Sequence, residues 1–432
     1  MTSRGFTGKR EGSIAAPRVG MFGLLGSGNI GNDGSLEALL TYLRTDHPDA
    51  ILDVMCPGPQ RVKAQYGVDG ILLQWYTRYA NQTSGVTAFV LKVLGKGIDV
   101  FRTASWVRRH DVVIVPGAGI LETTLPLRPW GMPYALFMLC AFGRMFGTKV
   151  ALVSVGANTI NQRLTRWLFI SAARLAFYRS YRDAQSRDAV RRQGIDTSRD
   201  AIYPDLVFAL PTPPPDHGAA QTVGLGVMAY YGGNDDRRAA AGIHASYAEK
   251  IQWFSRWLVD NGRKIRLFIG DDLDESVVQE ILADLRAHRP DFEPTWVVAE
   301  PTSSLGDLMR QMASVETIIA TRYHNVLCAL KVSKPTLSIG YAAKNESLMA
   351  EMGLAEFCQA ARSLDMDLLI KQFTELEHRS AELRQTLLER NAAKTQGIEH
   401  QFAMLSTLLF SAGEPARDRA QEQGRHSRRG VG

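Results

Sequence analysis

The sequence predicts an α/β protein with two Rossmann-like domains, each built on a parallel sheet, and helices at its C-terminal end. Three observations predict this class. The chain has 432 residues, which exceeds the length that a single hydrophobic core usually supports. Apolar, β-branched segments alternate with helical patterns, as they do when helices cover both faces of a parallel sheet. A proline-rich segment interrupts this alternation, which then restarts.

The first half supplies four of these strands. Their residues are apolar on both faces, as in the run Asp-Val-Val-Ile-Val-Pro at residues 111–116. We expect strands over residues 18–24, 50–55, 111–116 and 149–155, and helices over 36–43, 134–146 and 163–178.

The second half repeats the pattern beyond the prolines. We expect strands over residues 222–228, 264–270, 295–298, 315–320 and 334–341, and helices over 246–261, 276–288, 304–313 and 326–330. A helical pattern then covers residues 364–410, interrupted near Gly397.

These elements divide the chain into segments. Prolines at 213–215 cannot continue a helix or a central strand, so residues 211–221 are expected to link the domains. We expect domains over 18–210 and 222–363, C-terminal helices over 364–412, and disorder over 1–17 and the basic tail 413–432. Two such domains facing a cleft suggest a glycosyltransferase-B-like (GT-B-like) architecture, with ligands at the carboxyl ends of the strands.

Composition narrows the function classes. The net charge of +6 is modest, and no nucleic-acid-binding signature is present, so we expect no nucleic-acid partner. The four cysteines form no Cys-x-x-Cys pair, and no metal-ligand cluster is visible, so no metal site is expected. The longest apolar stretch, residues 132–142, is about half of a membrane span. We therefore expect a cytoplasmic protein.

A G-x-G-x-x-G motif at residues 26–31 follows the first expected strand. It could bind a dinucleotide, with Asp53 on the ribose, form a tight turn without a ligand, or bind a polar group of a substrate. Residues 32–35 favour helix caps over helix interiors, so the helix is expected to begin at Gly34 or Ser35. The longer loop that results favours the substrate-binding interpretation.

Two further motifs carry candidate groups. Gly117 and Gly119 follow the third strand, where small residues let a ligand approach the backbone, and Glu122 could act as a base beside them. The alternative is a simple turn between strand and helix. Arg182 opens an Arg-Asp-x-x-Ser segment that precedes Pro-Asp at 204–205; taken alone, an Arg-Asp pair is usually a surface ion pair.

The segment around Arg322 and His324 is the most informative. It ends a buried strand and starts a helix, which places a guanidinium and an imidazole at a helix N-terminus. Arginine can hold a phosphate or carboxylate with two hydrogen bonds, and histidine can move protons near neutral pH. Lys344 follows the next strand and adds a second cation. This arrangement predicts an anion-binding catalytic site.

Together these segments resemble the polysaccharide pyruvyl transferase family over roughly residues 19–357. Family members are similar in an N-x-G-D loop, a G-G-G turn, an R-D-x-x-S segment with a downstream P-D, and an R-x-H helix start with a lysine behind it. Here Asn32 stands where the loop usually has its Asp, with Asp33 adjacent, and Ala118 replaces the middle glycine. The order of the motifs and their placement at strand ends carry the resemblance.

The resemblance implies a transferase that moves the pyruvyl group of phosphoenolpyruvate, its donor substrate, onto a sugar diol. The product is a pyruvate ketal in cell-surface or exopolysaccharide biosynthesis, and no cofactor is needed. His324 would be the general acid, and Asp33 or Glu122 the base. Donor and acceptor would be held by Arg322, Arg182, Lys344, Asn29, Gly28, Gly117 and Gly119.

Two alternatives stay open at this point: a nucleotide-sugar-dependent glycosyltransferase, and a catalytically inactive ligand-binding relative. The helix over 163–178 mixes cations with aromatic residues, so it either rests on an anionic membrane, where a lipid-linked oligosaccharide acceptor would be met, or is an ordinary amphipathic helix. The acceptor sugar and the oligomeric state are not evident from the sequence.

Overall fold

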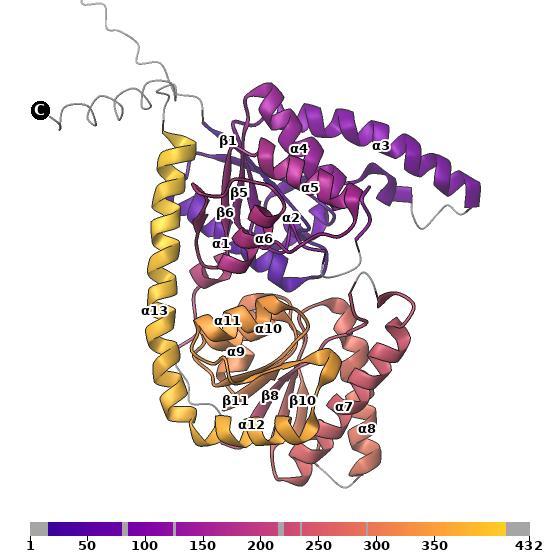
Figure 1. The fold of residues 1–432 in the computed structure, drawn as a ribbon, viewed down its shortest axis with the longest axis vertical. Helices are drawn as coiled ribbons and strands as arrows, with labels where there is room; N and C mark the ends of the chain where they lie inside the picture. The colour runs from indigo at the N-terminus through magenta and orange to yellow at the C-terminus, as the bar shows by residue number, and fades with distance from the viewer. Residues whose placement is uncertain are drawn as a thin grey trace, which may run out of the picture.

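The computed structural model describes residues 16–79, 85–123, 127–214, 220–233, 236–290 and 293–411. Two parallel sheets lie one above the other, each covered by helices, and a long helix runs beside both (Figure 1). Apart from Ala16 and Pro17, the disorder predicted for residues 1–17 and 413–432 lies outside the described residues. So does the central part of the predicted linker, residues 215–219.

The first sheet has the order β3-β2-β1-β4-β5-β6-β7, and every neighbouring pair is parallel. The chain therefore reverses its direction of winding between β1 and β4, the point where open α/β sheets bind ligands. Its strands are β1 (Arg18–Phe22), β2 (Ile51–Cys56), β3 (Asp69–Leu72), β4 (Val112–Pro116), β5 (Lys149–Val155), β6 (Tyr178–Tyr181) and β7 (Ala201–Ile202).

Six helices connect these strands: α1 (Ile30–Asp46), α2 (Pro59–Tyr66), α3 (Gly85–Val107), α4 (Met132–Phe146), α5 (Arg163–Leu175) and α6 (Ala184–Arg192). The expected helix over 163–178 is too long. It ends at Leu175, and the chain then enters β6, because residues 178–181 pair with the buried strand β5.

The second sheet repeats the design with the order β10-β9-β8-β11-β12-β13, again parallel throughout. Its strands are β8 (Thr222–Gly226), β9 (Lys264–Phe268), β10 (Val297–Ala299), β11 (Thr317–Ala320), β12 (Thr336–Gly340) and β13 (Cys358–Ala360). Its helices are α7 (Ala240–Asp260), α8 (Glu275–His288), α9 (Leu305–Ala313), α10 (Tyr323–Lys331) and α11 (Ala343–Glu351). The domain limits at residues 210 and 222 stay predictions.

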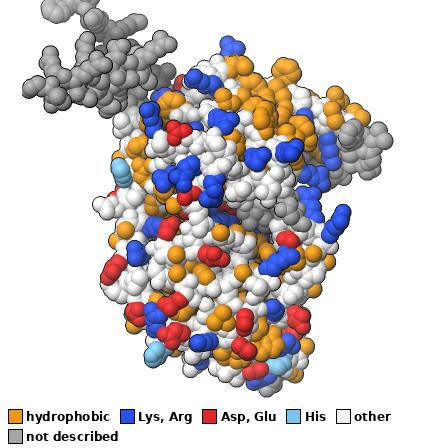
Figure 2. All heavy atoms as spheres, viewed as in Figure 1, with side chains coloured by type: hydrophobic (Ala, Val, Ile, Leu, Met, Phe, Trp, Pro, Cys, Tyr) orange, Lys and Arg blue, Asp and Glu red, His pale blue; other side chains and the backbone are white. Residues whose placement is uncertain are grey.

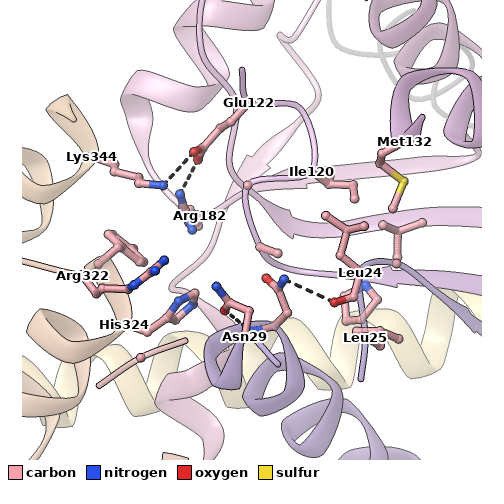
Figure 3. Close-up of a pocket in the computed structure, with 18 of the residues that line it drawn as sticks. Leu24, Leu25, Asn29, Ile120, Glu122, Met132, Arg182, Arg322, His324 and Lys344 are labelled. Atoms are coloured by element: carbon pink, nitrogen blue, oxygen red, sulfur yellow. Dashed lines mark hydrogen bonds and ion pairs between the residues drawn. The ribbon is translucent and has the colours of Figure 1, made fainter. Parts of the chain in front are cut away.

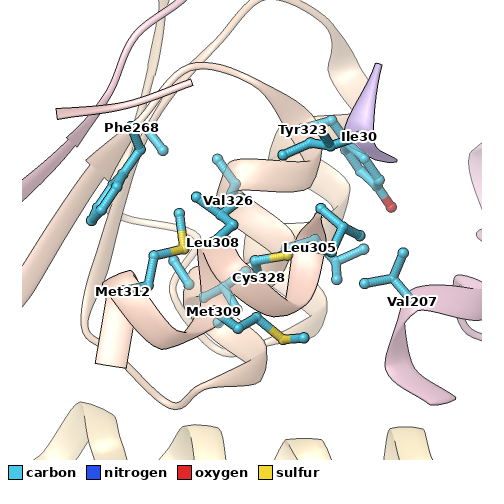
Figure 4. Packing of buried hydrophobic residues seen from close by; sticks show 14 of the residues in the cluster. Ile30, Val207, Phe268, Leu305, Leu308, Met309, Met312, Tyr323, Val326 and Cys328 are labelled. Atoms are coloured by element: carbon cyan, nitrogen blue, oxygen red, sulfur yellow. The ribbon is translucent and has the colours of Figure 1, made fainter. Parts of the chain in front are cut away.

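The two domains are in direct apolar contact. Ile30, at the start of α1, and Val207, in the 3-10 turn Leu206–Ala209, lie beside the apolar residues of α9 and α10 (Figure 4). A Cβ atom on Gly34 would overlap the side chain of Leu305, so the glycine lets α1 and α9 approach closely. This contact holds the starts of α1 and α10 close together.

Two helices end the described chain, α12 (Met366–His378) and α13 (Ser380–Leu405). The interruption predicted near Gly397 is wrong: α13 runs through it, and the helical pattern breaks at Arg379 instead. A Cβ on Gly397 would lie 3.0 Å from Pro204, so this glycine serves a close contact. Figure 1 shows α13 running along both domains.

Candidate active site

A cavity of about 260 Å³ lies between the carboxyl ends of the two sheets. One end is polar and combines residues of both domains, and the other end is apolar and belongs to the first domain (Figure 3). The polar end includes Asn29, Asn32, Glu122, Arg182, Arg322, His324 and Lys344. The apolar end includes Leu24, Leu25, Ile120, Leu127 and Met132.

The start of α1 differs from the prediction. The helix begins at Ile30, several residues before Gly34, because the side chain of Asn29 accepts hydrogen bonds from the N–H groups of Gly31 and Asn32 and caps it. The third glycine of the motif therefore lies inside the helix, and the argument for a longer polar loop is wrong. The Asn29 amide also donates to Asp271 across the domain boundary.

The early helix start places Asp33 away from the cavity. Asp33 is buried and accepts a hydrogen bond of 2.6 Å from the N–H of Gly26, and it does not line the cavity. Burial raises the pKa of this carboxyl. Asn32 faces the cavity in its place. Asp33 thus stabilises the glycine turn and is not in position to act as the predicted base.

Asp53, the ribose ligand of the dinucleotide interpretation, is also engaged elsewhere. Its carboxylate accepts hydrogen bonds from Trp106 Nε1 at 2.8 Å and from His110 Nε2 at 2.9 Å. It lies within β2 opposite Gly20, before the carboxyl end of the strand. The geometry gives no support to a dinucleotide site.

His324 lies in the first turn of α10 and lines the cavity beside the start of α1. A Cβ on Gly31 would overlap its imidazole ring, so the glycine makes this approach sterically feasible. Its Nε2 atom is buried and has no hydrogen-bond partner among the described residues. Burial lowers the pKa of His324 to about 4, so the ring is neutral at neutral pH.

Arg322 caps α10 and is held firmly by Asp274. Its Nε and Nη2 atoms donate to the two carboxylate oxygens at 2.6 and 2.7 Å. Burial alone would lower the pKa of Arg322, but the hydrogen bonds and charge of Asp274 raise it above its ordinary value. Asp274 also accepts from the N–H groups of Ala229 and Gly270, which fixes the arginine fork. Nη1 makes only a long contact, 3.9 Å, to Asp271.

Glu122 bridges two buried cations. One oxygen pairs with Arg182, and the other accepts from Lys344 Nζ at 2.8 Å (Figure 3). Arg182 also pairs with Asp205 at 3.4 Å and stacks its guanidinium on the Tyr323 ring, 4.3 Å from the centroid. Burial lowers the pKa of Lys344, but the Glu122 charge outweighs it and the net pKa is raised. Each oxygen of Glu122 therefore contacts one cation.

The predicted glycines divide into two groups. Gly119 lines the cavity, and a Cβ there would lie 2.7 Å from the Glu122 carboxylate. Gly117 has φ +47° and faces Ser35 outside the cavity, and Gly28 has φ +94° and faces Asp272. Both therefore serve their turns without lining the cavity.

Sequence reasoning missed the apolar end of the cavity, four further groups that line it and one supporting carboxylate. Ala118 lines the cavity in the left-handed region, with φ +58°, where a non-glycine residue is strained. Its position between the two glycines was the available signal. Asn32, Tyr323 and Tyr341 line the cavity, and Asp274 holds Arg322 from a loop with no motif that points to it.

Three helix N-termini converge on the cavity, those of α1, α10 and α11. The caps of α10 and α11, Arg322 and Ala342, make no side-chain capping hydrogen bond. Exposed N–H groups and the partial positive charge of a helix N-terminus favour an anion. With three cations nearby, the polar end is suited to a small, multiply charged anion. Within the described residues, no group of three His, Cys, Asp or Glu side chains could hold a metal ion.

The two facing Rossmann-like sheets with a cavity between them form a GT-B-like fold, which confirms the predicted fold class. Solved structures agree. MnaA from S. aureus, in a structure with UDP, is similar with a TM-score of 0.59 and 10% identity, covering 92% of this chain and 98% of that one. MurG from Acinetobacter baumannii has a TM-score of 0.52 and 11% identity over 90% of this chain and 99% of that one. At this identity the likeness shows the fold alone.

The family model for polysaccharide pyruvyl transferase matches residues 29–342, which is most of the chain. This protein therefore belongs to the polysaccharide pyruvyl transferase family and is a transferase. No curated protein matches the sequence. The matched range includes Asn29, Glu122, Arg182, Arg322 and His324, and ends just before Lys344.

Proposed function

We propose that this protein transfers the pyruvyl group of phosphoenolpyruvate to two hydroxyls of a sugar, forming a pyruvate ketal during cell-surface or exopolysaccharide biosynthesis. Family membership supports the reaction type. The observation that carries the proposal is the polar end of the cavity, where the unpartnered Nε2 of His324 lies among Arg182, Arg322 and Lys344. A phosphate and a carboxylate on one small molecule match this set of groups.

The chemistry needs a proton donor and a proton acceptor. A proton added to the methylene carbon of phosphoenolpyruvate makes that carbon a methyl group and C2 electrophilic. One sugar hydroxyl then attacks C2, the second displaces the phosphate, and both hydroxyls lose their protons. One of these protons balances the one placed on the methyl group, and the other leaves with inorganic phosphate. His324 is the acid in this proposal.

The base role falls to Glu122, because Asp33 does not line the cavity. The ion pairs of Glu122 with Arg182 and Lys344 stabilise its ionised carboxylate, so Glu122 would become a stronger base once it exchanges one of these contacts. Lys344 would then be released to bind the donor. Binding of the donor to Lys344 would thus free Glu122 to act as the base.

Phosphate release with phosphoenolpyruvate and a panel of hexosides tests the proposal. The wild-type protein should bind phosphoenolpyruvate and not nucleotide sugars, and should release phosphate only with a suitable diol. His324→Ala should keep donor binding and lose about 10²-fold or more of turnover. Arg322→Lys should weaken donor binding instead, because a lysine cannot make both hydrogen bonds to Asp274 and still present a further N–H group to the cavity.

His288→Ala and Arg256→Lys are matched controls, since both residues lie on the surface outside the cavity. Both controls should behave as wild type. Binding of nucleotide sugars in place of phosphoenolpyruvate would overturn the donor assignment, and full turnover by His324→Ala would overturn the acid assignment.

A further inference from the structure

Three neighbouring helices of the first domain carry large apolar side chains that face outward. α4 packs against both α3 and α5, so the three form one layer (Figure 1). Its exposed apolar residues, which we call the α3–α5 face, include Leu94, Phe101, Trp130, Met145, Trp167 and Phe177. Phe101 is 78% exposed and Met145 69%. Contiguous exposed apolar side chains of this size usually mark a binding surface.

The charge of this face has one sign. Helices α3, α4 and α5 contain a single acidic residue, Asp99, and it is buried and bonded to the Trp75 N–H and Arg102. Between Glu122 and Asp183 the chain has no acidic residue. Figure 2 shows hydrophobic side chains gathered over these helices with Lys and Arg beside them. The exposed cations are Lys92, Arg108, Arg109, Arg144, Arg163, Arg166 and Arg174.

Helices α3, α4 and α5 expose apolar and cationic side chains and no acidic side chain of their own, which matches one kind of partner, a bilayer surface with anionic headgroups. Tryptophan and phenylalanine suit the boundary between headgroups and acyl chains, and the cations suit the negative surface potential. None of the helices among the described residues is long and apolar enough to cross a membrane. Any contact made by this face is therefore a surface contact.

The face is continuous with the cavity. Leu127 and Met132 line the apolar end of the cavity, and Trp130, between them in sequence, is 58% exposed on the α3–α5 face. The short segment 127–132 thus joins the membrane-suited surface to the apolar end of the active site. A substrate carried on a lipid would reach the polar end from this side.

We propose that the α3–α5 face docks this protein on an anionic lipid bilayer, where segment 127–132 presents the apolar end of the cavity to an acceptor carried on a lipid. The second half of this statement rests on the proposed function, and the first half does not. Docking depends on Met145 and Trp167 for apolar insertion and on Arg163 and Arg166 for charge.

Vesicle co-sedimentation tests the docking. The full chain should sediment with vesicles that contain phosphatidylglycerol and not with phosphatidylcholine alone, and salt should weaken the binding. Met145→Glu/Trp167→Glu and Arg163→Glu/Arg166→Glu should each weaken binding on the order of 10-fold or more. Trp253→Glu is the matched control, because Trp253 is 40% exposed on α7, in the other domain.

Three results would overturn the docking. The first is no vesicle binding by the wild-type protein, or equal binding to both kinds of vesicle. The second is a loss in Trp253→Glu as large as in Met145→Glu/Trp167→Glu, which would make the effect non-specific. The third is a wild-type dimer that Met145→Glu/Trp167→Glu dissociates in sedimentation velocity, which would make the face a contact between two copies of this chain.

A separate assay distinguishes this proposal from the proposed function. Phosphate release with phosphoenolpyruvate and a water-soluble hexoside should be equal in wild type and Met145→Glu/Trp167→Glu, since both substituted residues lie outside the cavity. Vesicle binding without phosphate release would overturn the reaction and leave the docking in place. Phosphate release without vesicle binding would overturn the docking alone.

Discussion

His324 carries no positive charge at neutral pH. Burial lowers its pKa from 6.5 to about 4, so the free imidazole is neutral at pH 7. An anion placed beside Nε2 stabilises the imidazolium and raises that pKa. If the bound pKa rises above 7, the ring takes up a proton as the donor binds. Binding of the donor substrate would therefore protonate His324 and so create the acid of the proposed reaction.

We therefore expect phosphoenolpyruvate binding at pH 7 to take up about one proton in the wild-type protein and none in His324→Ala. Titration calorimetry in buffers that differ in ionisation enthalpy measures this number directly. Equal proton uptake by both proteins would place the proton on another group.

The ion pairs of Glu122 with Arg182 and Lys344 lead to a prediction about the stability of the protein. Removing one member of a buried ion pair leaves an uncompensated charge, at a cost of about 3–5 kcal/mol. Glu122→Gln leaves Lys344 without its carboxylate and should lower the free energy of unfolding by an amount of that order, whereas Lys344→Met should cost less, because Glu122 keeps its ion pair with Arg182. The double variant should lose less than the sum, since neither charge is then left alone. Denaturant unfolding measures all three.

Lys63→Met provides the control, because Lys63 and Asp69 form an ion pair that is 66% and 78% exposed. Removing an exposed pair should change stability by about 1 kcal/mol or less. Additive losses in the Glu122 and Lys344 cycle would contradict the direct coupling seen in the structure.

Motif placement at strand ends predicted which charged groups meet: Glu122, Arg182, Arg322, His324 and Lys344 all line one cavity. It did not predict how they are paired. Asp274 holds Arg322 from a loop 48 residues earlier, and no spacing rule connects the two. Ion pairs across a fold depend on side-chain geometry, which periodicity does not encode.

The start of α1 shows how one cap changes a site. The capping Asn29 sets the helix phase, and that phase turns Asp33 inward and Asn32 toward the cavity. Residues 32–35 are poor in helix interiors, but they lie within the first six residues of α1, where capping and packing outweigh propensity. This is why the prediction of a helix start at Gly34 failed.

Gly31, in the first turn of α1, lies against His324, and the role of this contact can be tested. A side chain there would overlap the imidazole of His324, so Gly31→Ala should displace the ring and reduce turnover by about 10²-fold. Gly242→Ala is the control, because a Cβ at Gly242 in α7 meets nothing within 4 Å. That change should stabilise the protein by about 0.5–1 kcal/mol. Steady-state kinetics and thermal unfolding separate the two effects.

Most interior strands were predicted to within a few residues, because strands buried on both faces are continuous apolar runs, but the four-residue interior strand β6 was missed. β5 matches its expected range of 149–155. The edge strands β3, β7 and β13 have only four, two and three residues and are partly exposed, so they lack that signal. Such short segments become strands because they pair with a neighbouring strand, and that neighbour lies far away in the sequence.

Helix α13 ties the two domains together. Asn391 donates to the carbonyls of Leu330 and Lys331 in the second domain, whereas Gln401 bonds Ser154 and Ser180 in the first. Repeating Rossmann-like patterns predicted the GT-B-like class, which is confirmed. The sequence could not show that α13 contacts both domains, because a helical pattern does not indicate which residues the helix will pack against.

Gln401→Ala should therefore destabilise the first domain selectively. It removes the acceptor of the buried Ser154 hydroxyl and one of the two hydrogen bonds that Ser180 Oγ accepts, at about 1–3 kcal/mol. We expect differential scanning calorimetry to show a single unfolding transition in wild type and a first domain that melts earlier in the variant. Gln385→Ala, on the exposed face of α13, should leave the trace unchanged. One unshifted transition in Gln401→Ala would contradict the bridging role.

The same helix has a consequence for biosynthesis. Gln401 lies between strands β5 and β6, and Tyr42 of α1 stacks on Phe402, 4.3 Å between ring centroids. The ribosome makes Gln401 247 residues after Ser154 and 221 residues after Ser180, a delay of roughly 10–50 s at elongation rates of about 5–20 residues per second. The nascent first domain must spend that interval with this side uncovered, so translation speed and holdase chaperones will govern its yield.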